Sequence, residues 1–223
     1  MRDIVIVGAG GSGKETLPYV EAFCAARSGY RLKGFVDRDP LRQGTDFCGY
    51  PVVGSDDGYV IGAHDVFLLA LGAPEGRKRA VEALQARGAA FLTLVHPLAY
   101  VAPSAEVRTG SVIFPFAYLG PDVVVDEFAL VNHYASCGHD VRVGRYAILG
   151  PYACTNGHVT IEDEVFLGTH ATVTVGKRVG RGSKVSAGGV VVQDVPPGVL
   201  AAGNPVSWRR LEAFQAVWRS RVR

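Results

Sequence analysis

A glycine-rich loop near the start of the chain has the residue types that bind phosphate. Residues 8–13 read Gly-Ala-Gly-Gly-Ser-Gly, which matches G-x-G-x-x-G, and an apolar run precedes them. In such a loop, backbone N–H groups and the N-terminus of the following helix face an anion. Asp37 ends a second apolar segment, about where an acid binds a ribose hydroxyl in dinucleotide-binding domains. Taken alone, this combination indicates NAD.

Other interpretations of the loop stay open. Residues 8–14 also match most of the phosphate-binding motif G-x-x-x-x-G-K, but Glu15 stands where that motif needs a serine or threonine for magnesium. We therefore disfavour a magnesium-dependent loop. Any nucleoside diphosphate would satisfy the loop amides, and a glycine turn without a ligand would also produce the pattern.

Alternating strands and helices would position this loop. Apolar runs predict strands over residues 4–7, 31–37, 66–71 and from residue 90, and we expect helices over about 14–27 and 75–87. This alternation predicts an α/β class with a parallel sheet. We assign residues 1–97 to a Rossmann-like domain, which at about 95 residues is short for a complete dinucleotide-binding fold.

A repeat of six residues fills the second half of the chain. Stepping by six from Val101 reaches sixteen positions without a slip, and fourteen of them are Val, Ile or Leu. The fourth residue after each is nearly always Ala, Ser, Gly or Val. A period of six fits neither an α-helix nor a plain strand. It predicts a three-sided parallel β-helix over residues 98–206, in which each branched residue points inward and stacks on its equivalent eighteen residues later.

The last segment, residues 207–223, is expected to be a helical tail. Trp208, Leu211, Phe214 and Trp218 follow helical spacing, and five arginines accompany them. The simplest interpretation is an amphipathic helix that caps the β-helix. Contact with a phosphate of coenzyme A, or with an anionic membrane, would be sharper roles for the arginines.

Composition excludes several classes of protein. The net charge of +2 is too small to predict nucleic-acid binding, and no apolar run approaches the ~18 residues of a membrane span. The N-terminal apolar stretch is too short for a secretory signal. Four cysteines without a CxxC pair suggest reduced thiols. We expect a cytoplasmic protein without membrane contact.

Several motifs together resemble the NeuD/PglD-type family of sugar O- and N-acyltransferases. They are the hexad array, the GAGGSGKE loop, FVDRD, ALGAPEGRKRA and the closing DVPPGVLAAGNP, which cover about residues 3–206. The resemblance implies a left-handed β-helix and a homotrimer with active sites between chains. It also implies that acetyl-CoA binds between two helices as co-substrate and that a sugar amine or hydroxyl is acylated.

The resemblance also implies roles for individual residues. The family's base is a histidine followed by an acid, here His139 and Asp140, and a neutral imidazole suits proton removal near pH 7. Asp140 would fix the imidazole tautomer and stabilise its cation. The two non-aliphatic stack positions, Cys137 and Thr155, are expected on adjacent coils beneath His139. An exposed histidine without a role is the alternative.

The other carried-over positions concern ligand binding. Nucleotide binding is implied for a set that comprises Gly10, Gly11, Ser12, Asp37, Arg38 and Gly72. Asn132 would lie near the acceptor sugar, and Thr169 and Ala187 would face coenzyme A. Some family members carry a second histidine nine residues after the base, where this chain has Ile148. Polarisation of the thioester carbonyl is therefore expected from a backbone N–H, such as that of a glycine on the next coil.

Three further histidines compete with His139. His133 is a candidate auxiliary group, and His158 and His170 occupy the fourth position of their hexads. Because these four histidines do not share one column of the eighteen-residue coil, we expect no metal site.

We predict an acetyl-CoA-dependent acetyltransferase that acts on the amino, or hydroxyl, group of a nucleotide-activated sugar for surface glycan synthesis. The alternatives are O-acetylation of a free sugar acid or small amino acid, and a non-catalytic β-helix scaffold. NAD-dependent oxidation is disfavoured because no second half of a dinucleotide fold is found.

Overall fold

The computed structural model describes residues 1–211, which form two compact units that divide after Leu94. This division falls shortly before residue 97, where the sequence places the end of the first domain. The boundary falls within strand β7 (Leu94–Val95), which pairs with β10 (Val112–Ile113) of the second unit.

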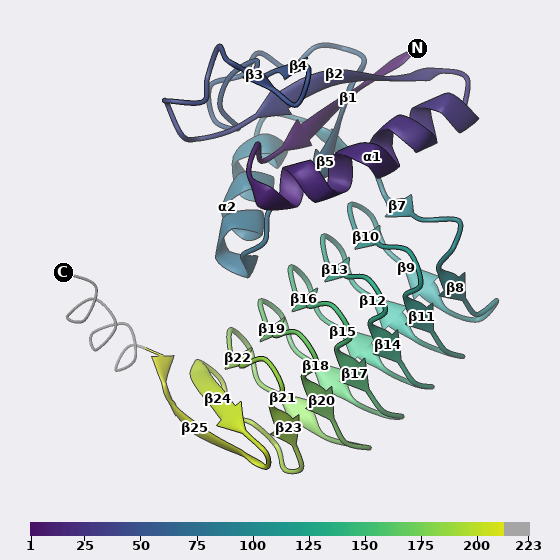
Figure 1. Ribbon diagram of the computed structural model, residues 1–223, viewed down its shortest axis with the longest axis vertical. Helices are drawn as coiled ribbons and strands as arrows, with labels where there is room; N and C mark the ends of the chain where they lie inside the picture. The colour runs from purple at the N-terminus through teal and green to yellow at the C-terminus, as the bar shows by residue number, and fades with distance from the viewer. Residues whose placement is uncertain (212–223) are drawn as a thin grey trace. The chain divides into compact units, whose positions relative to one another are not determined.

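The first unit is a four-stranded parallel sheet with two helices (Figure 1). Its elements are β1 (Arg2–Val7), α1 (Gly11–Ala26), β2 (Tyr30–Val36), β5 (Asp65–Leu69), α2 (Pro74–Gln85) and β6 (Ala90–Phe91), with a hairpin of β3 (Asp46–Phe47) and β4 (Tyr50–Pro51) between β2 and β5. Residues 4–7 of β1 and 66–69 of β5 are apolar and buried, as continuous apolar runs predict for a sheet covered on both faces.

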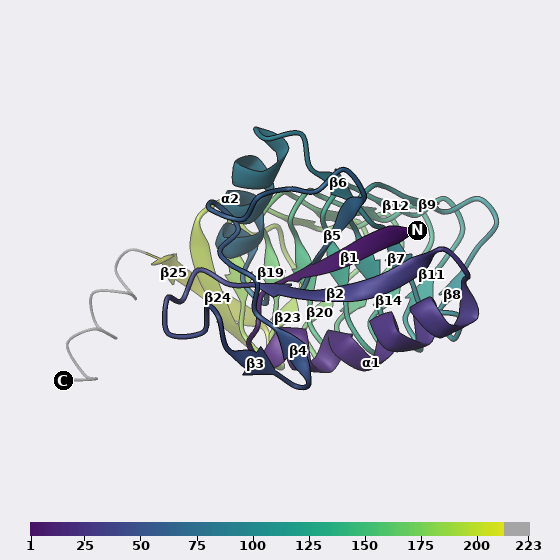
Figure 2. The same cartoon turned by 90° about the horizontal axis from the view of Figure 1, so that it is seen from above.

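The strand order of this sheet is β2-β1-β5-β6. The chain leaves β1 toward β2 on one side and returns to β5 on the other side. The carboxyl ends of β1 and β5 therefore border a topological switch point, where open α/β sheets bind ligands. Figure 2 shows β1 between β2 and β5.

The second unit is a left-handed parallel β-helix whose strands begin every six residues (Figure 1). The eight-stranded sheet contains β7, β10, β13 (Leu130–Val131), β16 (Ile148–Leu149), β19 (Phe166–Leu167), β22 (Lys184–Val185), β24 (Val199–Gly203) and β25 (Val206–Arg210). The six-stranded sheet contains β8 (Tyr100–Val101), β11 (Tyr118–Leu119), β14 (Ser136–Cys137), β17 (Cys154–Thr155), β20 (Thr172–Val173) and β23 (Val190–Val191). The five-stranded sheet contains β9 (Glu106–Val107), β12 (Val124–Val125), β15 (Arg142–Val143), β18 (Thr160–Ile161) and β21 (Arg178–Val179).

The inward stack forms the core of this unit. From Ile113 to Val191 every sixth residue is buried, and strands pair in a register of eighteen residues, such as Cys137 with Thr155. Each buried aliphatic side chain contributes roughly 1.5–3 kcal/mol, so the stack stabilises the unit without a helix. The predicted period and the neighbouring Cys137 and Thr155 are confirmed.

The corners of the coil use a left-handed backbone at the fourth residue of each hexad. Ten non-glycine residues from Phe116 to His170 have φ between 57° and 63° there. Glycine takes this position at Gly176, Gly182 and Gly188. Asp140 and His158 belong to the non-glycine group.

The predicted helical tail is wrong over residues 207–210. This stretch lies in β25, which pairs antiparallel with β24, and Trp208 lies opposite Ala201. β24 adds to the eight-stranded sheet through β22 and would otherwise leave an open edge, which β25 covers. Tertiary pairing therefore overrides the helical spacing at Trp208. The expected helix over residues 212–223 lies outside the described residues.

No helix among the described residues is long and apolar enough to cross a membrane. All four cysteines are free thiols.

Candidate active site

Close backbone contacts hold the glycine loop of the first unit in a tight turn between β1 and α1. Gly8 has φ 109°, and a β-carbon on it would lie 2.7 Å from the carbonyl oxygen of Ala70. A β-carbon on Gly13 would collide with the carbonyl oxygen of Gly8. These two positions therefore require glycine, which lets the strand run directly into the helix.

A cavity of about 270 Å³ opens at the switch point in front of this loop. Its lining residues are Gly8, Gly10, Gly11, Ser12, Asp37, Asp39, Arg42, Ala70, Leu71 and Gly72. Five of the six predicted nucleotide-binding residues are among them, and Arg38 is the exception. The first N–H groups of α1 have no partner within the helix, so the cavity favours a phosphate at that end.

Asp37 holds the loop in place. Its Oδ2 accepts the backbone N–H of Ala9 at 2.7 Å, and its Oδ1 accepts that of Asp39 at 2.9 Å. Arg42 donates from Nη1 to the carbonyl oxygen of Ala9. Arg42 was missed from the sequence because it lies in an irregular loop, yet it places a positive charge beside the cavity.

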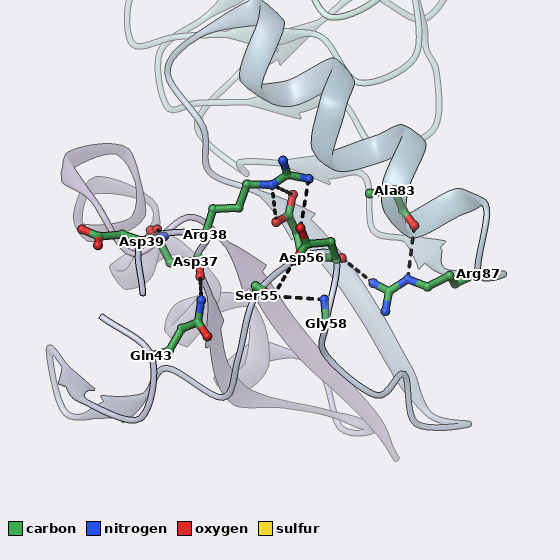
Figure 3. Close-up of polar contacts among 10 residues, drawn as sticks. Asp37, Arg38, Asp39, Gln43, Ser55, Asp56, Gly58, Ala83 and Arg87 are labelled. Carbon is green, nitrogen blue, oxygen red and sulfur yellow. Dashed lines mark hydrogen bonds and ion pairs between the residues drawn. The ribbon is translucent and has the colours of Figure 1, made fainter. Parts of the chain in front are cut away.

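Arg38 borders a second cavity, of about 140 Å³, which shares Gly8, Asp37 and Leu71 with the first. Figure 3 shows its guanidinium group against the carboxylate of Asp56. The Arg38 Nε lies 2.8 Å from Oδ1 and 3.1 Å from Oδ2 of Asp56. No sequence motif pointed to Asp56.

In the second unit, His139 lies at the corner between the six-stranded and five-stranded sheets, directly after β14. Its Nδ1 lies 2.8 Å from Oδ2 of Asp140. This hydrogen bond, together with the nearby imidazoles, holds the pKa of Asp140 below its usual value. The ionised carboxylate fixes the tautomer in which Nδ1 carries the proton and Nε2 keeps a lone pair. The pair is therefore set up for proton abstraction at Nε2.

The next coil provides the surroundings of this ring. A β-carbon on Gly157 would lie 2.6 Å from Cε1 and 3.0 Å from Cδ2 of His139, so glycine leaves room for the imidazole. Gly157 is buried, and its N–H has no hydrogen-bond acceptor among the described residues. An open N–H beside a candidate base can bind a carbonyl oxygen.

His158 also reaches this corner. The sequence did not predict this, because His158 and His139 are not separated by a whole number of eighteen-residue coils. Its ring centroid lies 4.8 Å from that of His139 in an edge-to-face arrangement, and its Nδ1 is 3.7 Å from Oδ2 of Asp140. The residue lies nineteen positions after His139, so an offset of one from the coil length still makes two side chains neighbours. Among the described residues, His139, Asp140 and His158 could hold a metal ion, since their ligand atoms lie within 4.8 Å of one another. An ion there would compete with the proton for His139.

The remaining predicted residues lie at another corner. Thr169 follows β19 and Ala187 follows β22, so both lie between the eight-stranded and six-stranded sheets on adjacent coils. Asn132 follows β13 at the same corner, and its Oδ1 accepts the His133 N–H at 2.7 Å. Within a single chain, these three residues therefore lie at a different corner of the coil from His139. Ile148 is buried in β16.

Known proteins resemble the chain in sequence and in fold. The family model described as the PglD N-terminal domain matches residues 3–84. The acetyltransferase domain of PglB from Neisseria gonorrhoeae FA1090 is 30% identical, with 93% of this chain and 99% of that chain covered and a TM-score of 0.83. WeeI from Acinetobacter baumannii AYE is 29% identical over 94% of this chain and 100% of that chain, with a TM-score of 0.85.

Two further similarities concern ligands and activity. PerB from Caulobacter crescentus, whose structure contains CoA and GDP-perosamine, is 29% identical over 94% of this chain and 98% of that chain, with a TM-score of 0.82. A 2,3,4,5-tetrahydropyridine-2,6-dicarboxylate N-acetyltransferase of Clostridium perfringens is 52% identical over 44 residues, 20% of this chain. The match spans 19% of the length of that curated relative.

Proposed function

The chain belongs to the NeuD/PglD-type family of sugar acyltransferases, and from this premise we propose that it acetylates an amino group of a nucleotide-activated sugar with acetyl-CoA. The observation that carries the proposal is the His139–Asp140 pair beside the open N–H of Gly157. A role in surface glycan synthesis is part of the proposal.

His139 acts as the general base. The neutral amine attacks the thioester carbonyl carbon, and a new C–N bond forms while Nε2 takes a proton from the nitrogen. The tetrahedral intermediate then expels the sulfur of coenzyme A, which leaves as a thiol with that proton. Asp140 stabilises the imidazolium that exists between the two steps, because it stays ionised beside it.

Gly157 supplies the donor for the developing oxyanion. Its N–H lies on the coil next to His139 and has no acceptor among the described residues. A backbone donor of this kind stabilises negative charge on a carbonyl oxygen as the tetrahedral intermediate forms. It replaces the second histidine, which is absent because Ile148 occupies that position.

The active site forms between copies of the chain, in a homotrimer. The residues proposed to face acetyl-CoA, Thr169 and Ala187, lie at a different corner of the coil from His139. A neighbouring copy that presents this corner to His139 would complete the site, and Asn132 would approach the acceptor from the same side. Symmetric association of identical chains is the usual way to form such a shared groove.

The first unit binds the nucleotide of the acceptor. The diphosphate would meet the N–H groups of Gly11 and Ser12 at the start of α1, with Arg42 beside them. The relative from C. crescentus binds an amino sugar on a nucleoside diphosphate, which fits this cavity. A free sugar acid or amino acid would leave the cavity without a use, so we favour the nucleotide sugar.

The test is release of free thiol from acetyl-CoA over a panel of nucleotide-linked 4-amino sugars. We expect turnover on at least one sugar, and His139→Ala should lower kcat/KM by roughly 10²- to 10⁴-fold, as for loss of a general base. His64→Ala, an exposed histidine in the first unit, should keep full activity.

Two results would contradict the proposal in different ways. Full activity of His139→Ala would contradict the role of His139 as general base but would leave the proposed acetyl transfer standing. No thiol release with any amino or hydroxyl sugar, from a folded oligomer, would remove the reaction itself and favour a scaffold.

A further inference from the structure

Two histidines and an aspartate meet where successive coils turn between the six-stranded and five-stranded sheets. Asp140 and His158 hold the same position on adjacent coils, and both have the left-handed backbone of that corner, with φ 58° and 60°. The backbone N–H of His158 donates to the carbonyl oxygen of His139 at 2.9 Å. The regular backbone therefore fixes the three residues relative to one another, as a metal site requires.

The donor atoms of these side chains have the spacing of ligands around a small transition-metal ion. Asp140 Oδ2 lies 2.8 Å from Nδ1 of His139 and 3.7 Å from Nδ1 of His158, and the ligand atoms all lie within 4.8 Å of one another. Tetrahedral zinc forms bonds of about 2.0–2.2 Å to nitrogen and oxygen, which places neighbouring ligand atoms about 3.3 Å apart. The two separations from Asp140 lie on either side of that value, and all three side chains are exposed enough to adjust.

The ligand types favour zinc over the common hard cations. Imidazole nitrogens suit zinc, nickel and copper, whereas magnesium and calcium prefer oxygen ligands. Two imidazoles and one carboxylate form a ligand set that proteins use for zinc, with water in the fourth position. Zinc therefore fits this corner, and magnesium does not.

An ion bound here would change the tautomer of His139. In the hydrogen-bonded pair, Nδ1 carries the proton that it donates to Asp140, and Nε2 keeps a lone pair. A metal ion on Nδ1 uses the lone pair of that nitrogen, so the single proton of the neutral ring is carried by Nε2 instead. One proton leaves Nδ1 and one binds Nε2, and the ring stays neutral. Nε2 is then a donor and cannot take a proton from an attacking amine.

We propose that His139, Asp140 and His158 form a zinc site whose occupation switches off the base. The binding of zinc depends on these three residues alone, whereas the loss of acetyl transfer rests on the proposed function. His158 has no assigned part in the proton transfer. Its contribution is the third ligand, which turns the pair into a metal site.

Calorimetric titration of the full, metal-free chain with zinc chloride tests the site without acetyl transfer. We expect one zinc ion per chain and no binding of magnesium. His158→Asn should weaken zinc binding at least about tenfold, because loss of a group that only orients a ligand already costs roughly 10- to 100-fold. Asparagine tolerates the left-handed backbone at this position.

His170→Asn is the matched control. His170 has nearly the same left-handed φ, 58°, but it lies at the corner between the eight-stranded and six-stranded sheets, where its ring stacks on Tyr152. Cys48→Ser removes an exposed thiol, which is another zinc ligand. Both variants should bind zinc as the wild type does. Melting curves without metal show whether each variant is folded.

Two further measurements follow the base itself. In ¹⁵N spectra of labelled histidine, the His139 ring should carry its proton on Nδ1 without metal and on Nε2 with zinc. Formation of the acetylated sugar, measured by mass spectrometry, should fall in step with zinc occupancy and recover when EDTA is added. His158→Asn should need at least about tenfold more zinc for the same fractional loss of its own metal-free activity.

The outcomes separate the two proposals. Equal zinc affinity of the wild type and His158→Asn overturns the metal site and leaves the acetyl transfer standing. Zinc binding that leaves the His139 proton on Nδ1, or leaves acetyl transfer at its full rate, overturns the switch. Absence of acetyl transfer by the metal-free protein contradicts the proposed function, while the calorimetric comparison still decides whether the zinc site exists.

Discussion

The two units of the molecule position their functional groups in opposite ways. In the β-helix, His139, Asp140 and Gly157 lie at one corner because successive coils repeat every eighteen residues. In the α/β unit, the cavities are formed by loops that follow different strands, and Asp37 and Asp56 reach them through irregular segments.

This difference shows what a regular backbone contributes to a site. In a regular repeat, the position of a side chain follows from its place in the sequence. The contacts of His139 therefore depend on the missing β-carbon of Gly157, one coil away. The loops of the first unit depend on polar links instead, such as those from Asp37 to Ala9 and from Arg38 to Asp56. A small steric change should therefore act on catalysis in one unit and on stability in the other.

Among small steric changes, Gly157→Ala is expected to have the largest effect, and it acts on catalysis. The added methyl group would lie in contact with the His139 ring, which is exposed and can swing away without disturbing the core. We expect activity to fall about 100-fold, as for a catalytic group displaced by about 1 Å, while thermal stability changes little. Steady-state thiol release and a melting curve measure the two effects.

Val175→Ala is the matched control, because Val175 follows Gly157 by one coil and is 59% exposed. It should behave as the wild type. A Gly157→Ala protein with full activity would show that the ring needs no space there.

A smaller effect is expected from Gly13→Ala in the first unit. A β-carbon there collides with the carbonyl oxygen of Gly8, and overpacking of this kind costs about 1–3 kcal/mol. Gly11→Ala has nothing within 4 Å of its new methyl group and should be neutral or slightly stabilising. Urea unfolding followed by circular dichroism measures the free energy of unfolding. Equal stability of the two variants would mean that the loop can relax.

The smallest effect concerns Cys137, and it tests how closed the β-helix core is. Burial raises the pKa of the Cys137 thiol to about 12, so raising the pH from 7 to 9 should leave it protonated and unreactive. Cys48 is exposed and should be alkylated readily. Mass spectrometry after iodoacetamide treatment distinguishes the two sites. Labelling of Cys137 in the folded protein would reveal opening of the coil.

The β-helix could be predicted from the sequence because its six-residue period determines which residues point inward and which strands pair. The register that joins Cys137 to Thr155 follows from counting by eighteen. His158 was nevertheless missed as a neighbour of His139, since neighbours at a corner can be offset by one residue. The strand that contains Trp208 was missed because an open sheet edge, and not local spacing, decided its structure.

The α/β unit could be predicted only in part. The glycine loop and Asp37 were visible as a motif with a mechanism, whereas Asp56 and Arg42 belong to segments without periodicity. Their positions depend on contacts with distant backbone groups, such as that of Arg42 with Ala9. No local pattern in the sequence records such contacts.

The left-handed corners lower the local stability of the β-helix wherever a residue other than glycine occupies them. A residue with a β-carbon costs about 1 kcal/mol or more in this conformation, and glycine avoids the cost. One coil after His158, the same position is occupied by Gly176, which adopts the left-handed conformation at a lower cost in free energy. Asp140 and His158 keep their side chains at unfavourable backbone angles. Eight further non-glycine residues from Phe116 to His170 have the same left-handed φ. The corner that holds the proposed base therefore shares with most corners of the coil a local stability below what glycine would give.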